Sequence, residues 1–255
     1  MTRLAHKLGF SPGLAFHDVY SFTDPDLLAL VPRPALGLLF IHACTETSDR
    51  FRDDDERRRL EQQQGKQPAS GGLANGTRIG ASSGKQPLFF HQTITHACGL
   101  YALLHILLNG PAREHILPSS FLAKLLAEAE PLSISERSRL LEQSDELERA
   151  HEESAAQGQS TAPVRGVEPG NAFLSFVVVR DEFDGPGGWR LWELEGSRSG
   201  PIDHGLIAGR DGDDVDALHP DVLDKGPLAF LKREESAGHG GIGFSCIVLG
   251  PNVEE

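Results

Sequence analysis

Short apolar runs separated by Gly- and Pro-rich turns predict the strands of this chain. Residues 35–41 and 173–179 are almost entirely apolar, which is typical of central strands buried on both faces. Residues 189–196 alternate between apolar and acidic side chains and predict the second strand of a hairpin, with Glu193 and Glu195 on one face. Two further strands are predicted at residues 14–20 and 243–249.

Apolar residues at helical spacing, bounded by capping and stop signals, predict the helices. The clearest case is residues 98–109, which are mainly apolar and are followed by Gly110-Pro111. Ser133 and Glu136 have the spacing of a capping box, and we expect one helix to run from there to residue 150. Other helices are predicted at residues 24–30, 47–64, 121–129 and 221–235, the last interrupted near residues 226–227.

The length of the chain bounds its domain organisation. With 255 residues it can form one large α/β domain with a substantial core, and we expect residues 1–255 to do so. Residues 65–85 are rich in Gly, Ser, Ala and Asn and predict a flexible insertion. Residues 152–171 are small, polar and Pro-containing, and they predict an exposed, mobile loop between two apolar elements.

Composition narrows the classes of partner. The chain has 37 acidic and 24 basic residues, for a net charge of −13, and an acidic chain without a basic stripe argues against a nucleic-acid partner. No apolar run is long enough to span a membrane. The three cysteines, Cys44, Cys98 and Cys246, form no disulfide framework and indicate a reducing compartment. We therefore expect a cytoplasmic or nuclear monomer that needs no cofactor and no metal.

Cys98 is the strongest candidate for chemistry. It stands where the apolar helix begins, and the N–H groups and dipole of a helix N-terminus favour a thiolate. Gly99 leaves room for a backbone to pass close to the sulfur. Gln92 lies upstream, and its side-chain amide together with the Cys98 N–H could bind a developing oxyanion. The alternative is a structural cysteine buried in a core helix.

Several stretches along the chain match one family pattern. The strongest match is Gln92-Thr93-Ile94, followed by Ala97-Cys98-Gly99 and Leu104-His105. Further stretches agree in order, at residues 7–10 with 18–20, 31–34, 150–163 and 191–205. Together these residues resemble the ubiquitin C-terminal hydrolase family, the papain-like deubiquitinases, in its short single-domain form. The similarity covers almost the whole chain.

The resemblance implies a fold, an activity and a partner. The fold is α/β and papain-like, with a central, mostly antiparallel sheet flanked by helices and a knotted chain path. The activity is hydrolysis of small adducts or flexible peptides from the C-terminus of ubiquitin, so ubiquitin or a ubiquitin-like protein is the expected partner. Carried over, Cys98 is the nucleophile and Gln92 the oxyanion donor. Residues 152–171 match the crossover loop, under which the ubiquitin tail must thread.

Three departures from the family pattern concern the site and the start of the chain. The family places its general-base His in the strand after the crossover loop, within a His-Phe-Ile-like triplet, and here the triplet is Ser175-Phe176-Val177. An Asp in a Glu-Leu-Asp-Gly pattern orients that His, and here Glu195 can do the same if the backbone tolerates one more methylene. The chain also begins roughly ten residues late, so we expect an empty strand position or an incomplete sequence.

The choice between two possible functions therefore depends on Ser175. A hydroxyl without a nearby base cannot take the thiol proton at neutral pH, although Ser175 is also compatible with a plain core serine. Of the nearby histidines, His96 is first in line as a substitute base, whereas His105 fits a packed core residue better. A metal site of His91, His96 and Cys98 lacks the usual ligand spacing. Two hypotheses follow: a working thiol hydrolase, slow or with a rearranged base, or a pseudoenzyme that binds ubiquitin without turnover.

Overall fold

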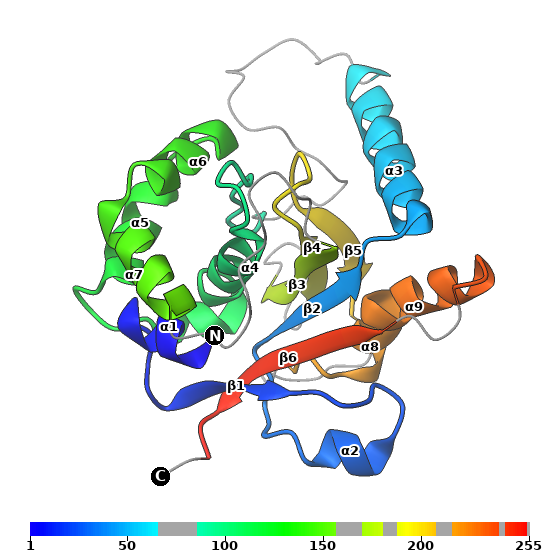
Figure 1. Ribbon diagram of the computed structural model, residues 1–255, viewed down its shortest axis with the longest axis horizontal. Helices are drawn as coiled ribbons and strands as arrows, with labels where there is room; N and C mark the ends of the chain where they lie inside the picture. The colour runs from blue at the N-terminus through cyan, green and yellow to red at the C-terminus, as the bar shows by residue number, and fades with distance from the viewer. Residues whose placement is uncertain (66–85, 157–169, 181–187, 208–215, 240–242, 254–255) are drawn as a thin grey trace.

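The structure, a computed structural model, describes residues 1–65, 86–156, 170–180, 188–207, 216–239 and 243–253. Within these ranges the strands form one six-stranded antiparallel sheet in the order β1-β6-β2-β3-β4-β5, with helices on both faces (Figure 1). This confirms the expected fold class, while the knotted chain path stays a prediction. The strands are β1 (Leu14–Asp18), β2 (Gly37–Ala43), β3 (Asn171–Arg180), β4 (Trp189–Leu194), β5 (Ile202–Leu206) and β6 (Phe244–Pro251).

The strands lie where apolar runs predicted them, with one exception. β5 was not predicted, because its sequence is largely polar and none of its residues is buried. It is instead held at the edge of the sheet by pairing with β4 and by a polar contact, in which the Arg190 guanidinium donates to the Asp203 carboxylate at 2.9 Å. Hydrophobic alternation gives no signal for an edge strand of this kind.

One predicted helix needs correction. The capping box of Ser133 and Glu136 forms, but the helix expected from residue 133 to residue 150 is two helices, α6 and α7. The Ser144 hydroxyl accepts the Leu147 N–H at 3.2 Å, because serine favours a cap over a helix interior. The helices are α1 (Thr2–Lys7), α2 (Pro25–Ala29), α3 (Glu46–Gly65), α4 (Cys98–Leu107), α5 (Phe121–Ala129), α6 (Ile134–Glu142), α7 (Asp145–Ala156), α8 (Pro220–Lys225), α9 (Pro227–Ser236) and a 3-10 helix (Gly110–His115).

The two predicted loops fall mostly outside the described residues. α3 extends to Gly65, and the rest of the expected insertion, residues 66–85, is not described. The loop expected at residues 152–171 begins later than predicted, since α7 continues to Ala156, and its residues 157–169 are likewise not described. What the structure fixes is that this connection leads from α7 into β3.

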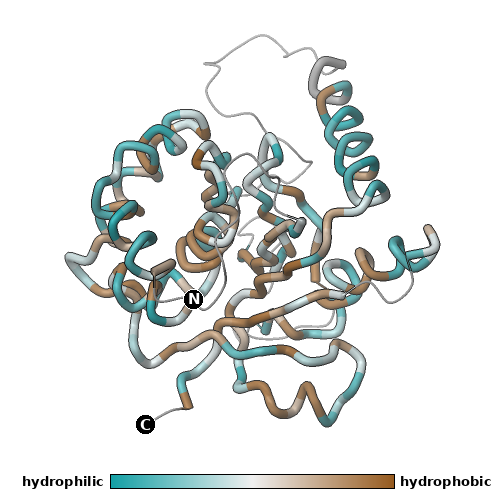
Figure 2. The backbone as a smooth tube through the Cα atoms, viewed as in Figure 1, coloured by the Kyte–Doolittle hydropathy of each residue, from teal (hydrophilic) through white to brown (hydrophobic). Residues whose placement is uncertain are grey.

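Alternation along the strands divides the apolar side chains between two cores. α4 packs on β2 and β3, and Val177, Trp192 and Leu194 belong to the core on that face. Phe176 and Val178 belong to the core on the other face, with residues of α8 and α9. Figure 2 shows apolar residues concentrated along the sheet and α4, whereas α3 is hydrophilic along most of its length. Cys98, the first residue of α4, therefore lies on the side of the sheet where Val177, Trp192 and Leu194 are buried.

The segment before Cys98 is fixed to α4 by buried polar groups. Asn109 makes three hydrogen bonds, accepting the Leu88 N–H at 2.6 Å and donating to the Leu88 and His105 carbonyls at 2.8 Å each. His105 Nε2 accepts the Phe90 N–H at 3.1 Å, and burial lowers the pKa of His105 to about 3, so this ring is neutral. These bonds position residues 88–90 and the cleft residues that follow them.

We predict that Asn109→Ala destabilises the fold strongly. The substitution leaves a buried N–H and two carbonyls without their partner, which should lower the free energy of unfolding by on the order of 3 kcal/mol. Urea denaturation at a constant m-value measures this change. The matched control is Asn252→Ala, which removes an exposed donor to the Pro12 carbonyl and should cost less than about 1 kcal/mol. Equal losses for the two variants would contradict the proposed importance of the Asn109 contacts.

Candidate active site

A cleft of about 400 Å³ opens where β2 ends, β3 begins and the chain leaves β4. Cys98, the first residue of α4, lies in this cleft with Gln92 and Glu195, so the structure brings these three predicted site residues together. Ser175 is not among the residues that line the cleft. The lining also includes Cys44, Arg52, His96, Asn171, Ala172, Phe173, Gly196 and Ser197.

Cys98 is partly buried at the N-terminus of α4. Its sulfur interacts with backbone N–H groups, its own and that of Gly99, and these lower the pKa of the thiol. Burial acts in the opposite direction and is the larger cause, so the pKa of Cys98 is raised above its ordinary value. The helix N-terminus alone therefore does not make this cysteine a thiolate at neutral pH.

Gln92 is held beside Cys98 by the residue that follows Glu195. The Gln92 backbone N–H donates to the Gly196 carbonyl at 2.7 Å, and its side-chain amide donates to the Ile94 carbonyl at 3.1 Å. A Cβ on residue 196 would lie 2.9 Å from the Gln92 Cβ, which explains why glycine occupies this position. An amide nitrogen carries two hydrogens, so one remains for a ligand in the cleft.

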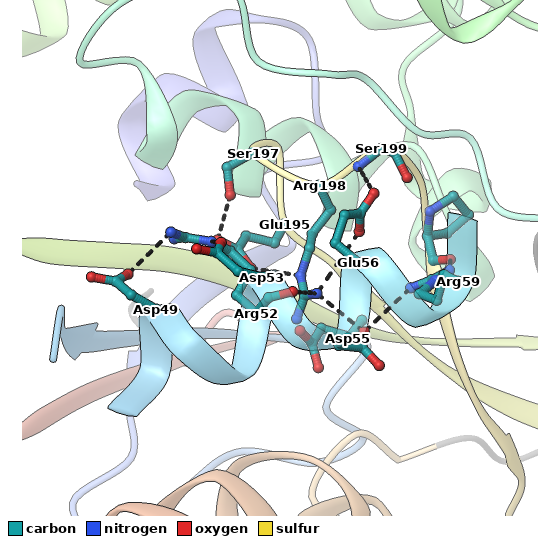
Figure 3. Close-up of polar contacts among 12 residues, drawn as sticks. Asp49, Arg52, Asp53, Asp55, Glu56, Arg59, Glu195, Ser197, Arg198 and Ser199 are labelled. Carbon is teal, nitrogen blue, oxygen red and sulfur yellow. Dashed lines mark hydrogen bonds and ion pairs between the residues drawn. The ribbon is translucent and has the colours of Figure 1, made fainter. Parts of the chain in front are cut away.

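Glu195 belongs to an ion-pair network that joins the cleft to α3 (Figure 3). Its carboxylate accepts the Ser197 hydroxyl at 2.5 Å and the Arg198 Nε at 3.3 Å. Arg198, with only 4% of its side chain exposed, also donates to the Asp55 carboxylate and to the Arg52 carbonyl, both at 3.1 Å. Arg198 could not be predicted from the sequence, because its partners on α3 lie more than a hundred residues away.

Ser175 does not lie where the sequence led us to expect it, at the base position between Cys98 and Glu195. Ser175 is fully buried, and its hydroxyl donates to the Ala102 carbonyl of α4 at 2.8 Å. It pairs with Leu194 across the hairpin and points to the α4 face, so the next residue, Glu195, follows on the opposite face. Ser175 therefore does not stand between Cys98 and Glu195.

Ala172 is the small side chain of β3 that opens on the cleft. It lines the cleft together with Asn171 and Phe173, at the beginning of the strand. It also borders a second cavity, of about 190 Å³, that Glu195 and His42 line on the other face of the sheet. His42 pairs directly with Ala172 across β2 and β3, a neighbour that the sequence did not reveal. No residue of β3 is a histidine.

Three other histidines near the cleft have polar partners within the protein. The His91 ring donates to the Arg198 carbonyl at 3.0 Å, and the His204 ring lies 2.9 Å from the Glu193 carboxylate. The His42 ring donates to the Ala43 carbonyl at 2.9 Å. His96, by contrast, lines the same cleft as Cys98.

Two further findings concern membranes and metals. None of the described helices has the combination of length and apolar character that crossing a bilayer requires. Among the described residues, His, Cys, Asp and Glu side chains do not gather in groups of three or more that could hold a metal ion.

Comparison with known proteins gives consistent matches. The model of the family described as ubiquitin carboxyl-terminal hydrolase, family 1, matches residues 1–224. An Aplysia californica ubiquitin carboxyl-terminal hydrolase is 29% identical over 214 residues, covering 82% of each chain. Arabidopsis thaliana ubiquitin carboxyl-terminal hydrolase 3 is 26% identical over 250 residues, covering 98% of this chain and 89% of its own.

A solved structure matches at the level of the fold. The Trichinella spiralis UCH37 catalytic domain bound to ubiquitin vinyl methyl ester aligns with a TM-score of 0.64 and 19% identity, covering 98% of this chain and 90% of that one. The family match extends over most of the sequence. The chain therefore belongs to the ubiquitin carboxyl-terminal hydrolase family, whose members are cysteine-type deubiquitinases.

Proposed function

We propose that this protein is a thiol hydrolase that removes small adducts or flexible peptides from the C-terminus of ubiquitin. The observation that carries the proposal is that Cys98, Gln92 and Glu195 line one cleft in a chain of this family. Support for ubiquitin as the partner comes from the Trichinella structure of similar fold, which is bound to ubiquitin vinyl methyl ester. In the proposed roles, Cys98 is the nucleophile and Gln92 the oxyanion donor.

The proposed reaction follows from the contacts of these two residues. The Cys98 sulfur attacks the carbonyl carbon at the ubiquitin C-terminus, and negative charge develops on the carbonyl oxygen. The second hydrogen of the Gln92 amide and the Cys98 N–H are the donors that stabilise this charge. The C–N bond to the adduct then breaks, and the amine leaves with the proton that the Cys98 thiol gave up. Water hydrolyses the resulting thioester, which releases the ubiquitin carboxylate and restores the thiol.

We assign the connection between α7 and β3, of which residues 157–169 lie outside the described ranges, to the crossover loop of the family. It enters β3 at Asn171, which lines the cleft. A chain segment that crosses at this point would admit a substrate tail by threading and would exclude large folded leaving groups by steric access. This accounts for the proposed preference for small or flexible adducts.

A second function is favoured by one specific observation. The residue of β3 that we propose at the family's base position is Ala172, within the triplet Ala172-Phe173-Leu174, and a methyl group cannot accept a proton. Burial also raises the pKa of Cys98. Losing the base of a Cys-His system costs on the order of 10³-fold in rate. The alternative function is therefore a catalytically impaired protein that binds ubiquitin or a ubiquitin-like protein.

The assignment of the nucleophile predicts selective labelling. A ubiquitin derivative with a C-terminal electrophile should modify Cys98, and mass spectrometry of the digested protein should locate the adduct there. Cys98→Ala should abolish the labelling. Cys44→Ala is the sharper control, because Cys44 lines the same cleft and should be dispensable, while Cys246 is buried in β6. Labelling at Cys44 or Cys246 would overturn the assignment.

The position of Ala172 predicts a gain of function. Ala172→His places an imidazole in the cleft beside Cys98, and hydrolysis of a fluorogenic ubiquitin C-terminal amide should rise by about 10-fold or more. Ser175→His is the control, because the larger ring enters the α4 core instead. That variant should lose about 1–3 kcal/mol of stability and gain no activity. A folded Ala172→His protein no faster than the parent would contradict the assignment of residue 172.

A further inference from the structure

His96 has two features that its role in the fold does not explain. Its backbone φ is +59°, in the left-handed region, which is uncommon for a residue other than glycine. Both of its ring nitrogens are buried, and neither has a hydrogen-bond partner in the described part of the chain. Buried polar atoms almost always have partners. Strained backbone and unsatisfied polar groups of this kind concentrate at functional sites.

The position of His96 connects these features to the cleft. The residue precedes Cys98 by two positions, in the turn that leads into α4, and it lines the same cleft as Cys98 and Ala172. β3, in contrast, contributes no imidazole there. We propose that His96 is the general base that takes the thiol proton of Cys98 in this chain, once its ring, which makes no hydrogen bond to the Cys98 sulfur in this structure, has turned toward that sulfur. The inference rests on the proposed function, in which Cys98 is the nucleophile.

The competing imidazoles are engaged elsewhere. His91 Nδ1 lies 3.0 Å from the Arg198 carbonyl. His105 is wholly buried and accepts a backbone N–H. His42 lies opposite Ala172, but its ring packs 4.0 Å from the Phe230 ring and lines the cavity on the other face of the sheet. Among the described residues, His96 is the imidazole that lines the Cys98 cleft with both nitrogens unpartnered.

The proton balance of the step is simple. The S–H bond of Cys98 breaks, a ring nitrogen of His96 gains the proton, and the resulting thiolate attacks the substrate carbonyl. The imidazolium then returns the proton to the leaving amine, so acylation consumes no net proton. Three other ionisable groups line the cleft, Cys44, Arg52 and Glu195. Of these, Glu195 carries a carboxylate and Arg52 a guanidinium group, so charges of both signs line the cleft.

The first test measures the thiol without ubiquitin. Alkylation of Cys98 by iodoacetamide is followed by peptide mass spectrometry as a function of pH. In the parent, the rate should show an ionisation near neutrality, the signature of an imidazole coupled to the thiol. His96→Asn keeps a residue that tolerates the left-handed turn, and it should lower the rate at pH 7 by about 10-fold or more. His91→Asn is the matched control and should keep the parent profile.

The second test measures turnover in combination with Ala172→His. His96→Asn should lower hydrolysis of the fluorogenic ubiquitin amide by about 10²-fold. Adding Ala172→His to this variant should restore the rate, because a second imidazole then replaces the lost one. A structural role for His96 would give no such rescue. If His96→Asn does not fold, His96→Gly preserves the positive φ and answers the same question.

The outcomes separate this inference from the proposed function. A His96→Asn protein with the parent's alkylation profile and the parent's rate of hydrolysis overturns the role of His96. A parent whose alkylation rises only above pH 9, as for an unassisted thiol, overturns it as well. If no variant hydrolyses the ubiquitin amide but the alkylation profiles of parent and His96→Asn still differ, the role of His96 stands and the proposed substrate is wrong.

Discussion

The close packing of α4 on the sheet is the constraint on which the cleft depends. A Cβ on Gly37 of β2 would lie 2.7 Å from the Ile106 side chain, so glycine at this position lets the helix approach the strand. On β3, the Ser175 hydroxyl bonds to the Ala102 carbonyl of the same helix. With α4 fixed in two places, its first residue, Cys98, is held at the edge where β2 ends and β3 begins. The serine expected at the family's base position thus positions the helix that carries Cys98, the proposed nucleophile.

A second constraint fixes the other wall of the cleft. Arg198 is buried, and it is paired with carboxylates of Glu195 and Asp55 rather than left alone. Removing one partner from such a group is far more costly than the net stability that the pair contributes. The network therefore holds α3 against the chain that leaves β4 and orients the Glu195 carboxylate (Figure 3). Glu195 serves both as a wall of the cleft and as an anchor for α3.

The sequence predicted most helices and strands correctly, but it did not predict which residues of β3 point toward α4. Apolar runs located every strand except the polar edge strand β5, and the capping box at Ser133 formed as expected. β3, however, is buried on both faces, so hydrophobic alternation cannot tell which of its residues point toward α4. The assignment of Ser175 failed for this reason, and pairing with Leu194 decided the phase. Contacts between segments far apart in the sequence, such as those of Arg198 with α3, produce no local sequence pattern from which they could be predicted.

Binding of a substrate and its hydrolysis require different groups in this cleft. Recognition of an extended C-terminal peptide needs space and backbone partners, and in the proposed mechanism the Gln92 amide and the Cys98 N–H stabilise the oxyanion. Neither depends on an imidazole, and in thiol and serine hydrolases such contributions persist when the base is lost. Ionisation of Cys98 is different, because burial raises its pKa and the local N–H groups do not compensate. The group that accepts this one proton, and not the fold, thus determines whether the chain turns over its substrate or only binds it.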